Sequence, residues 1–369
     1  DLTYEGQLSL KTQKVKDVIE RIGHQNPDLV KPALGPKEPW AYRNKMQMPV
    51  GGTKGDIQIG FYAMGSHDIV QGTNCPIQDE GNNIIAQACY QIAKEFDIEP
   101  YDEHTGKGVL RHIIGRIGQS GWMIILVTAT EQLPYKEKWV EKLTERIPQV
   151  ETIVHNVNSK RTNVILGPKN NILYGDGTIT DHIKDLQFTL SPHSFFQVNP
   201  EQTTVLYDQA LEYADLKGDE TVIDAYCGTG TISLFLAHKA KHVIGIEIVE
   251  PAIINARENA QRNGYDNTEF IVADAAVEMP KLYKAGVRPD VIVFDPIRAG
   301  CKEEVLTSAA GMEPKRIVYV SCNPATMARD IEILTHYGYE LQEVQPVDMF
   351  PMTAHVEAVA LLTRNEVTQ

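Results

Sequence analysis

The chain has 369 residues, of which 42% are hydrophobic and 23% are charged, a composition typical of globular proteins with more than one domain. We find no apolar run long enough to span a bilayer and no signal-peptide pattern, so we expect a cytoplasmic protein with no membrane partner. Five cysteines in so long a chain argue against a secreted disulfide framework.

The net charge of −14 argues at first against a nucleic-acid partner. The charge is unevenly distributed, however, because residues 1–190 hold 21 Lys and Arg against 23 Asp and Glu, whereas the remainder holds 14 against 26. Residues 104–130 contain three basic side chains and no acid. Arg43 and Lys45 lie beside aromatic residues, a pairing that suits phosphates and stacked bases. The alternative is a set of scattered, solvated charges on a sheet.

The first half of the chain predicts a helix followed by a mixed domain. Apolar spacing indicates an amphipathic helix at 8–23, and we expect residues 1–29 to pack on the C-terminal domain. Short β-type runs between turns indicate a central α+β domain at 30–185, which we expect to bind nucleic acid through its cations and aromatic residues. Its predicted elements are strands at 121–128 and 163–166 and helices near 82–96 and 135–147.

From about residue 200, strands alternate with helices, a pattern typical of a doubly wound parallel sheet, and we assign 186–369 to this domain. The predicted strands are 221–226, 242–248, 269–273, 290–295 and 316–321, and the predicted helices are 231–239, 251–263, 303–310 and 325–336. Two further strands, 341–348 and 355–362, follow without a helix between them. This terminal hairpin favours a class I methyltransferase sheet over a dehydrogenase.

A glycine turn at the end of the first strand, Asp224-Ala-Tyr-Cys-Gly-Thr-Gly230, suits a nucleoside cofactor. Gly228 and Gly230 allow the backbone to approach a ligand, and Glu247 ends the next strand, where it can accept hydrogen bonds from ribose hydroxyls. Because the G-x-G-x-x-G spacing and a P-loop lysine are both missing, a pyrophosphate is poorly supported. Alone, the turn could be a plain connection. With the acid and the hairpin, it favours S-adenosylmethionine.

A hydrophobic strand ends in a thiol within Arg316-Ile-Val-Tyr-Val-Ser-Cys-Asn-Pro324, which places Cys322 at an expected active-site crevice. The helix that follows could favour the thiolate through its N-terminal dipole. The alternative for any one cysteine is inert packing, which suits Cys89 and Cys227.

Taken in order, these motifs resemble the RNA uracil-5-methyltransferases of ribosomal and transfer RNA, most closely the branch that acts on 23S ribosomal RNA. The resemblance covers the C-terminal half and extends weakly into the first half. The matching stretches are 191–199, 224–230, 245–247, 295–298, 319–324 and 355–357, with a weaker match at 42–45.

The resemblance implies a function and a set of site residues. The implied reaction transfers a methyl group from S-adenosylmethionine to carbon 5 of a uridine in RNA, through attack of Cys322 on carbon 6 and removal of the carbon-5 proton by Glu357. The residues implied to contact S-adenosylmethionine are Gln197, Tyr226, Glu247 and Asp295. We expect 23S ribosomal RNA as the substrate, bound by the central domain at 30–185, with transfer RNA as the alternative. We also expect a flipped target base and a monomeric protein.

Two positions depart from the family pattern. The family usually has Asp-Pro-Pro-Arg where this chain has Asp295-Pro-Ile-Arg298, and we expect activity to be retained because the acid and the arginine remain. Some members hold an iron–sulfur cluster, and Cys75 matches one of its ligands. A single thiolate cannot hold such a cluster, so we expect no metal in this chain. The chain begins with Asp rather than Met. An upstream RNA-binding module that carries the other cysteine ligands of such a cluster is therefore a possibility that the sequence leaves open.

Other functions remain as alternatives. A nicotinamide dehydrogenase would need a fuller glycine motif and would leave Cys322 and Glu357 without a role. A methyltransferase of exocyclic amines would carry an aromatic residue where this chain has Arg298. A non-catalytic RNA assembly factor that binds S-adenosylmethionine is also compatible with the sequence. Phe195 and Phe196 could stack on bases, although we expect both to pack against helices.

Overall fold

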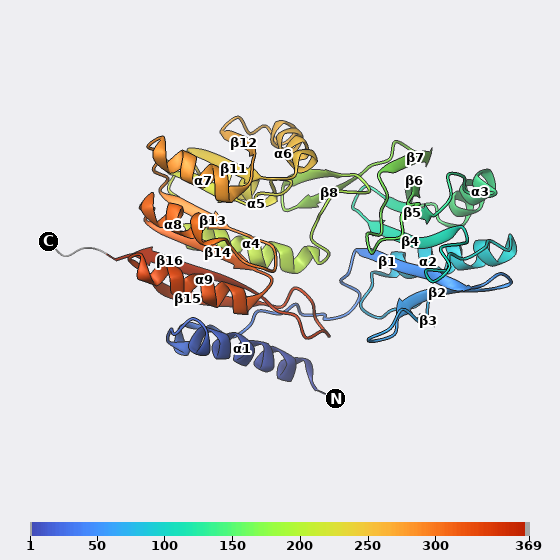
Figure 1. Ribbon diagram of the computed structural model, residues 1–369, viewed down its shortest axis with the longest axis horizontal. Helices are drawn as coiled ribbons and strands as arrows, with labels where there is room; N and C mark the ends of the chain where they lie inside the picture. Colours follow the sequence, from blue (N-terminus) through green and yellow to red (C-terminus); the bar gives the residue numbers. More distant parts are fainter. Residues whose placement is uncertain (1, 366–369) are drawn as a thin grey trace. The chain divides into compact units, whose positions relative to one another are not determined.

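The computed structural model describes residues 2–365, and the chain divides into two compact units. Unit 1 takes Asp1–Pro39, Ile183–Gln187 and Asn199–Gln369, and unit 2 takes Trp40–His182 and Phe188–Val198 (Figure 1).

The units differ from the predicted domains at 30–39 and 188–198, which have identifiable contacts, and at 183–185, which belongs to unit 1. The first segment forms bridges to a strand of unit 1, Val30 to Val344 and Leu34 to Val347. The second is bound in unit 2 by the Arg116 guanidinium, which donates to two of its carbonyl groups.

Unit 1 contains a seven-stranded sheet in the order β12-β11-β10-β13-β14-β16-β15. Five strands are parallel, and β16 is antiparallel to both of its neighbours, β14 and β15. The strands are β10 (Thr221–Ala225), β11 (His242–Glu247), β12 (Thr268–Val272), β13 (Val291–Phe294), β14 (Arg316–Ser321), β15 (Tyr339–Val347) and β16 (Glu357–Arg364). The order reverses between β10 and β13, which is where ligands of such sheets bind. This is the predicted sheet with its terminal hairpin.

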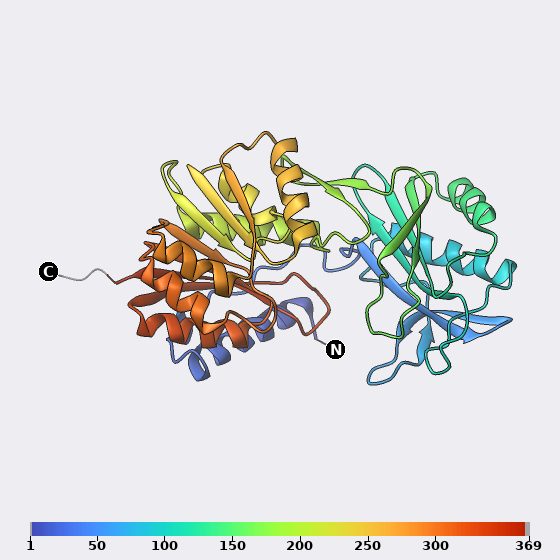
Figure 2. The same cartoon turned by 45° about the horizontal axis from the view of Figure 1, so that its top comes forward.

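Helices cover both faces of this sheet. On one face lie α4 (Pro200–Ala214), α5 (Thr231–Ala237) and α6 (Glu250–Arg262). The other face carries α7 (Ala275–Lys284), α8 (Glu303–Gly311), α9 (Pro324–His336) and α1 (Tyr4–Arg21), which share one buried core with the strands. Figure 2 shows the orange and red helices of this second face together in front of the sheet, with the blue α1 beside them.

Two helices of unit 1, α4 and α7, were not predicted. Helix α7 carries Pro280 in its interior, where proline normally argues against a helix because it removes a backbone donor. Tertiary packing decides the outcome, since Met279 of the same helix is fully buried in the core. The predicted N-terminal helix begins four residues earlier than expected, at Tyr4, where the Thr3 side chain caps it by accepting from the Gly6 N–H.

Unit 2 is built on a seven-stranded sheet in the order β3-β2-β1-β4-β5-β6-β7, antiparallel except between β5 and β6. Two helices, α2 (Glu80–Glu95) and α3 (Lys136–Arg146), contribute buried residues to its core. Its strands are β1 (Lys45–Thr53), β2 (Asp56–Tyr62), β3 (Ile69–Gln71), β4 (Leu110–Ile117), β5 (Trp122–Thr128), β6 (Val150–Val157) and β7 (Lys169–Tyr174). The remaining elements are η1 (Pro27–Leu29) and the two-stranded sheet of β8 (Ile179–Ile183) and β9 (Leu186–Leu190).

The predicted strand at 163–166 is wrong, because this segment is a loop and the strand begins at Lys169. The Asn158 side-chain amide donates to the carbonyl groups of Val164 and Ile165 at 2.6 and 3.0 Å. These side-chain bonds replace the strand-to-strand bonds that an alternating apolar run would otherwise form.

Two arginines from the acid-free stretch 104–130 are buried in unit 2 rather than exposed. Arg111 is 3% exposed and donates to the carbonyl groups of Asn158 and Lys160 at 2.6 and 2.7 Å. Arg116 is 4% exposed and donates to the carbonyl groups of residues 192 and 194. Two of the three cations in this acid-free stretch therefore hold loops in place, whereas the third, Lys107, is exposed.

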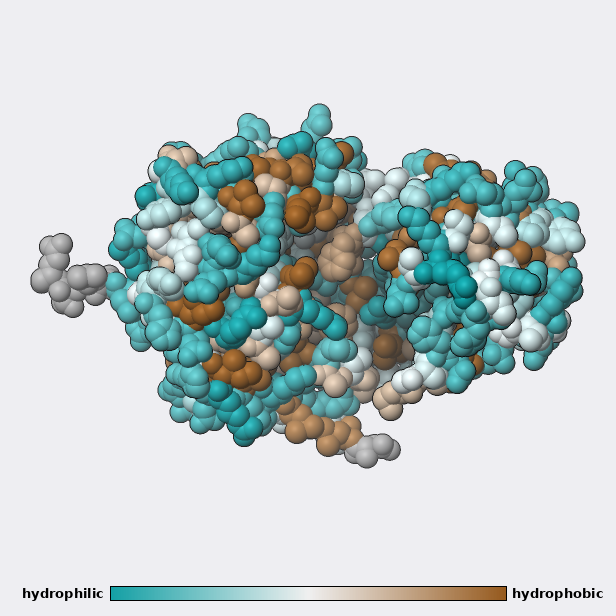
Figure 3. All heavy atoms as spheres, in the orientation of Figure 1, coloured by the Kyte–Doolittle hydropathy of each residue, from teal (hydrophilic) through white to brown (hydrophobic). Residues whose placement is uncertain are grey.

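Hydrophilic residues cover most of the visible face of each unit, and hydrophobic residues form small, separate patches there (Figure 3). None of the helices within residues 2–365 has both the length and the apolar character needed to cross a membrane.

Candidate active site

Five of the six predicted site residues meet at one edge of the unit 1 sheet. Tyr226 follows β10, Glu247 ends β11, Asp295 follows β13 and Cys322 follows β14, so all four lie at the carboxyl ends of parallel strands. Glu357 begins β16. Because β16 runs antiparallel to β14, its first residue lies at the same edge.

The strand register brings the thiol and the carboxyl group of the predicted reaction close together. Ser321 of β14 pairs with Ala358 of β16. Continuing that register by one residue places Cys322 opposite Glu357. The charge of Glu357 in turn influences the thiol, in agreement with this placement.

The sixth residue, Gln197, belongs to unit 2 and is therefore described apart from the other five. Its role in cofactor binding stays a prediction. Of the neighbouring aromatic residues, Phe196 packs against Phe188 of β9, with ring centroids 5.5 Å apart, whereas Phe195 is 71% exposed. The predicted helix packing is therefore wrong for Phe195, and Phe196 packs on a strand residue.

The turn after β10 has an unusual backbone conformation. Tyr226 has a φ of 94°, which is strained for a residue with a side chain, and Gly228 and Gly230 have φ values of 54° and 81°. A Cβ at Gly228 would meet nothing within 4 Å, so this glycine is required by its conformation and leaves open space beside the turn. Strain in such a turn is typical of a ligand-binding loop.

The Glu247 carboxylate joins this turn to the end of β11. One oxygen accepts the Gly228 N–H at 3.2 Å, and the other accepts the Val249 N–H at 3.0 Å. Since each carboxylate oxygen has two lone pairs, both retain capacity for a further donor such as a hydroxyl group.

The sequence analysis missed Asp224 as a site residue. It is fully buried, one of its carboxylate oxygens accepts from the Ser233 hydroxyl at 2.5 Å, and the other has no hydrogen-bond partner among the described residues. Burial raises the pKa of this carboxyl group to about 7. An acid within the apolar strand run 221–225 is a signal that could have identified it.

The Cys322 thiol is half-buried and is not pre-activated. Burial raises its pKa, and the nearby carboxyl groups of Glu357 and Asp295 act in the same direction, while Arg298 opposes them. The pKa is therefore raised overall, and a contribution of the α9 dipole in favour of the thiolate stays a prediction. Asn323 lies between the thiol and α9 and caps that helix with its own side chain, which accepts from the Ala325 N–H.

Asp295 and Glu357 have strongly raised pKa values. Burial, followed by the charge of Asp295, raises the pKa of Glu357 to about 8, and burial, followed by the charge of Asp224, raises the pKa of Asp295 to about 7. Neither acid forms an ion pair with a cation in the described part of the chain. These groups can therefore hold or release protons near neutral pH, as general acid–base catalysis requires.

The loop with the unusual Asp-Pro-Ile-Arg sequence is held in place by α9. The Arg298 carbonyl accepts from the Asn323 amide at 3.0 Å and from the Thr326 hydroxyl at 3.1 Å. Arg329 donates to the carbonyl groups of residues 299 and 301. Ile297 is 76% exposed, so its side chain does not take part in these anchors.

Cys75 lies in the loop before α2, half-buried, where its N–H donates to the Asn83 side chain at 3.0 Å. Within residues 2–365 there is no group of three or more His, Cys, Asp or Glu residues that could hold a metal ion.

Comparison with known proteins supports the interpretation of this geometry. Residues 125–365 match the family model described as tRNA (uracil-5-)-methyltransferase. A Bacillus cereus protein named as an RNA methyltransferase is 52% identical over 99% of this chain and 80% of its own length. A Halalkalibacterium halodurans RNA methyltransferase is 52% identical over 98% of this chain and 79% of its own.

A solved structure is similar over nearly the whole chain. The Pyrococcus abyssi tRNA (uracil-54, C5)-methyltransferase in complex with S-adenosyl-L-homocysteine has a TM-score of 0.81 and 29% identity, and it covers 98% of this chain and 84% of that one. This similarity confirms the predicted fold class and supports S-adenosylmethionine as the cofactor. With the family match over well over half its length, the chain belongs to the RNA uracil-5-methyltransferase family.

Proposed function

We propose that this protein methylates carbon 5 of a uridine in RNA, with Cys322 as nucleophile and Glu357 as general base. The observation that carries the proposal is the placement of a thiol and two carboxyl groups of raised pKa at adjoining strand ends, next to a strained glycine turn. A dehydrogenase would give the thiol and Glu357 no role, and an inert packing cysteine would need no such neighbours.

The strand ends of unit 1 fit S-adenosylmethionine as the cofactor. Asp224 offers a buried carboxylate oxygen without a partner among the described residues, which suits a cationic or hydrogen-bonding ligand group. Glu247 keeps lone pairs for ribose hydroxyls, and the backbone at Gly228 leaves room for close approach. We propose that Tyr226, Glu247 and Asp295 hold this cofactor. The contact of Gln197 with the cofactor, which the family resemblance implies, stays a prediction. When bound, it supplies an electrophilic methyl group to carbon 5 of the base.

The protein's own groups then account for the rest of the reaction. Carbon 5 of uracil is a weak nucleophile, so the Cys322 thiolate adds to carbon 6. The electron pair of the carbon 5–carbon 6 double bond moves to carbon 5 and the adjoining carbonyl oxygen, which gives an enolate whose carbon 5 is reactive. After carbon 5 has gained its methyl group, the Glu357 carboxylate removes the carbon-5 proton. The electron pair of that C–H bond restores the double bond, the carbon–sulfur bond breaks, and the thiolate is released.

We propose 23S ribosomal RNA as the substrate, as the sequence motifs and layout of that branch suggest. Transfer RNA is the second candidate, favoured by the similarity to the archaeal enzyme whose name specifies transfer RNA. The two candidates share the chemistry of unit 1, so they differ only in which RNA is bound.

Nucleoside mass spectrometry on unmodified ribosomal and transfer RNA, each incubated with the protein and S-adenosylmethionine, tests the proposal. We expect 5-methyluridine in ribosomal RNA and none with Cys322→Ala. Formation in transfer RNA alone would overturn the choice of substrate. Cofactor binding without product in either RNA would favour a non-catalytic binding factor.

A further inference from the structure

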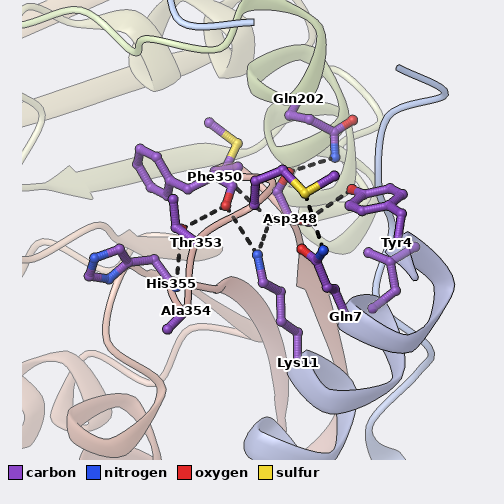
Figure 4. Close-up of polar contacts among 12 residues, drawn as sticks. Tyr4, Gln7, Lys11, Gln202, Asp348, Phe350, Thr353, Ala354 and His355 are labelled. Carbon is purple, nitrogen blue, oxygen red and sulfur yellow. Dashed lines mark hydrogen bonds and ion pairs between the residues drawn. The ribbon is translucent and has the colours of Figure 1, made fainter. Parts of the chain in front are cut away.

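A buried ion pair connects the N-terminal helix to the loop that precedes Glu357. Lys11 of α1 lies 2.6 Å from a carboxylate oxygen of Asp348, and the two side chains are only 6% and 0% exposed. The second oxygen of Asp348 accepts from the Tyr4 hydroxyl at 2.8 Å. Figure 4 shows these three side chains converging from α1 and from the loop.

The contacts from α1 extend along the whole loop. Lys11 also donates to the Phe350 carbonyl at 3.1 Å, and Gln7 donates to the Met352 sulfur at 3.1 Å (Figure 4). Lys14 donates to the Ala354 carbonyl at 3.0 Å. Residues 4, 7, 11 and 14 share one face of a helix, because side chains three and four positions apart lie next to each other. One polar face of α1 therefore contacts a single loop, residues 348–356.

This loop connects the two strands beside the proposed base. It runs from the end of β15 at Val347 to the start of β16 at Glu357, and these two residues pair across the hairpin. Met352 within it has a φ of 63°, a strained value for a residue with a side chain. A long, strained loop needs anchors to keep one conformation.

Stability alone is a poor explanation for these anchors. A buried ion pair is often no more stable than apolar residues of similar volume, since removing two charges from water costs as much as their attraction returns. Such pairs can instead select one conformation. The apolar side chains of α1, Val15 and Ile19, already attach the helix to the core.

We propose that Lys11, Tyr4 and Asp348 are positioning residues that hold the loop 348–356 so that Glu357 can reach the carbon-5 proton. This inference rests on the proposed function. It assigns to the N-terminal helix a part in the second half of the reaction, the release of the covalent intermediate, and none in the attack by Cys322.

The order of the reaction provides the test. Because Glu357 acts after the thiol has added to the base, a misplaced Glu357 leaves adduct formation intact and slows its resolution. In Lys11→Met we expect product formation to fall roughly 10-fold to 100-fold. The RNA–protein adduct that survives denaturant should rise several-fold, while KM for RNA changes by less than about threefold. Lys16→Met, the same change at a position of α1 without a polar partner in the described chain, should behave as wild type.

Tyr4→Phe keeps the ring and removes one hydrogen bond, so it serves if Lys11→Met fails to fold. It should give the same pattern with a smaller effect. Amide hydrogen exchange on the free proteins should show faster exchange in 348–356 for Lys11→Met and Tyr4→Phe, and no change for Lys16→Met.

A parallel fall of adduct and product, or an unchanged Tyr4→Phe in both measurements, would overturn the inference. Absence of 5-methyluridine with the wild-type protein would contradict the proposed function itself and the inference with it.

Discussion

Buried and partly buried acids occur in two regions of unit 1, and the two groups differ in their ion-pair and hydrogen-bond partners. The first region holds Asp348, after β15, and Asp330, in α9. Asp348 is paired with Lys11, and Asp330 accepts from Arg329, from the Tyr319 hydroxyl and from the Cys301 N–H. At the strand ends, Asp224, Asp295 and Glu357 have no cationic partner in the described chain, and their pKa values are raised. Paired acids shape the loops, and unpaired acids are available for chemistry.

The largest effect is expected from Glu357→Gln, which removes the proposed base. We expect turnover to fall by about 10² to 10⁴, the usual contribution of a general base, with accumulation of the Cys322 adduct. Rapid-quench kinetics with denaturing gels measures both quantities. Unchanged turnover would show that Glu357 has a structural role, like Asp348 and Asp330, and would contradict the assignment of acids without cationic partners to catalysis.

The paired region is tested by Asp348→Asn, which leaves Lys11 buried without its counter-charge. We expect a loss of about 3 kcal/mol in the free energy of unfolding, because an uncompensated buried charge is expensive. Urea denaturation measures this loss. In Lys11→Met/Asp348→Asn both charges are gone, and recovery of most of the lost stability should follow.

Deprotonation of Glu357 should also lower the free energy of unfolding as the pH rises. Its folded pKa of about 8 lies above its ordinary value of 4.5, so the native state favours the protonated form. The stability that it contributes is present below pH 4.5 and is lost as the pH rises towards 8. At pH 8.5 we therefore expect Glu357→Gln to be more stable than wild type by roughly 4 kcal/mol, with no difference at pH 4.5.

Catalysis should respond to pH in the opposite direction. Both the Cys322 thiol and the Glu357 carboxyl group must lose a proton, and both have raised pKa values. We expect the single-turnover rate to increase from pH 6.5 to about 8.5 with a slope above zero throughout. A rate that is flat over this range would mean that bound ligands reset both pKa values.

The smallest effect is expected from Arg298→Gln. Arg298 is exposed and lowers the pKa of Cys322 against the opposing acids, so its removal should reduce the thiolate fraction. We expect alkylation of Cys322 at pH 7.5 to slow by roughly twofold to fivefold. Lys284→Gln, at the end of α7, is the control and should leave the alkylation rate unchanged.

Local sequence patterns determined much of the fold of unit 1 and part of the candidate active site. The strands of unit 1, the glycine turn, the thiol before Asn-Pro and the terminal hairpin are all local features, because periodicity and turn chemistry act over a few residues. These features were sufficient to predict the fold class and family. The strand that ends before Asn-Pro identified Cys322 as a candidate, whereas Glu357 was a candidate only through the family resemblance.

Other properties were decided only by tertiary structure. Helix α7 forms around Pro280 because its apolar face is buried, and Arg111 and Arg116 became structural because distant carbonyl groups surround them. The pKa values of Glu357 and Cys322 depend on burial and on neighbours far apart in the sequence. The contact of Lys11 with Asp348 spans 337 residues, and no local pattern records a pair at that separation.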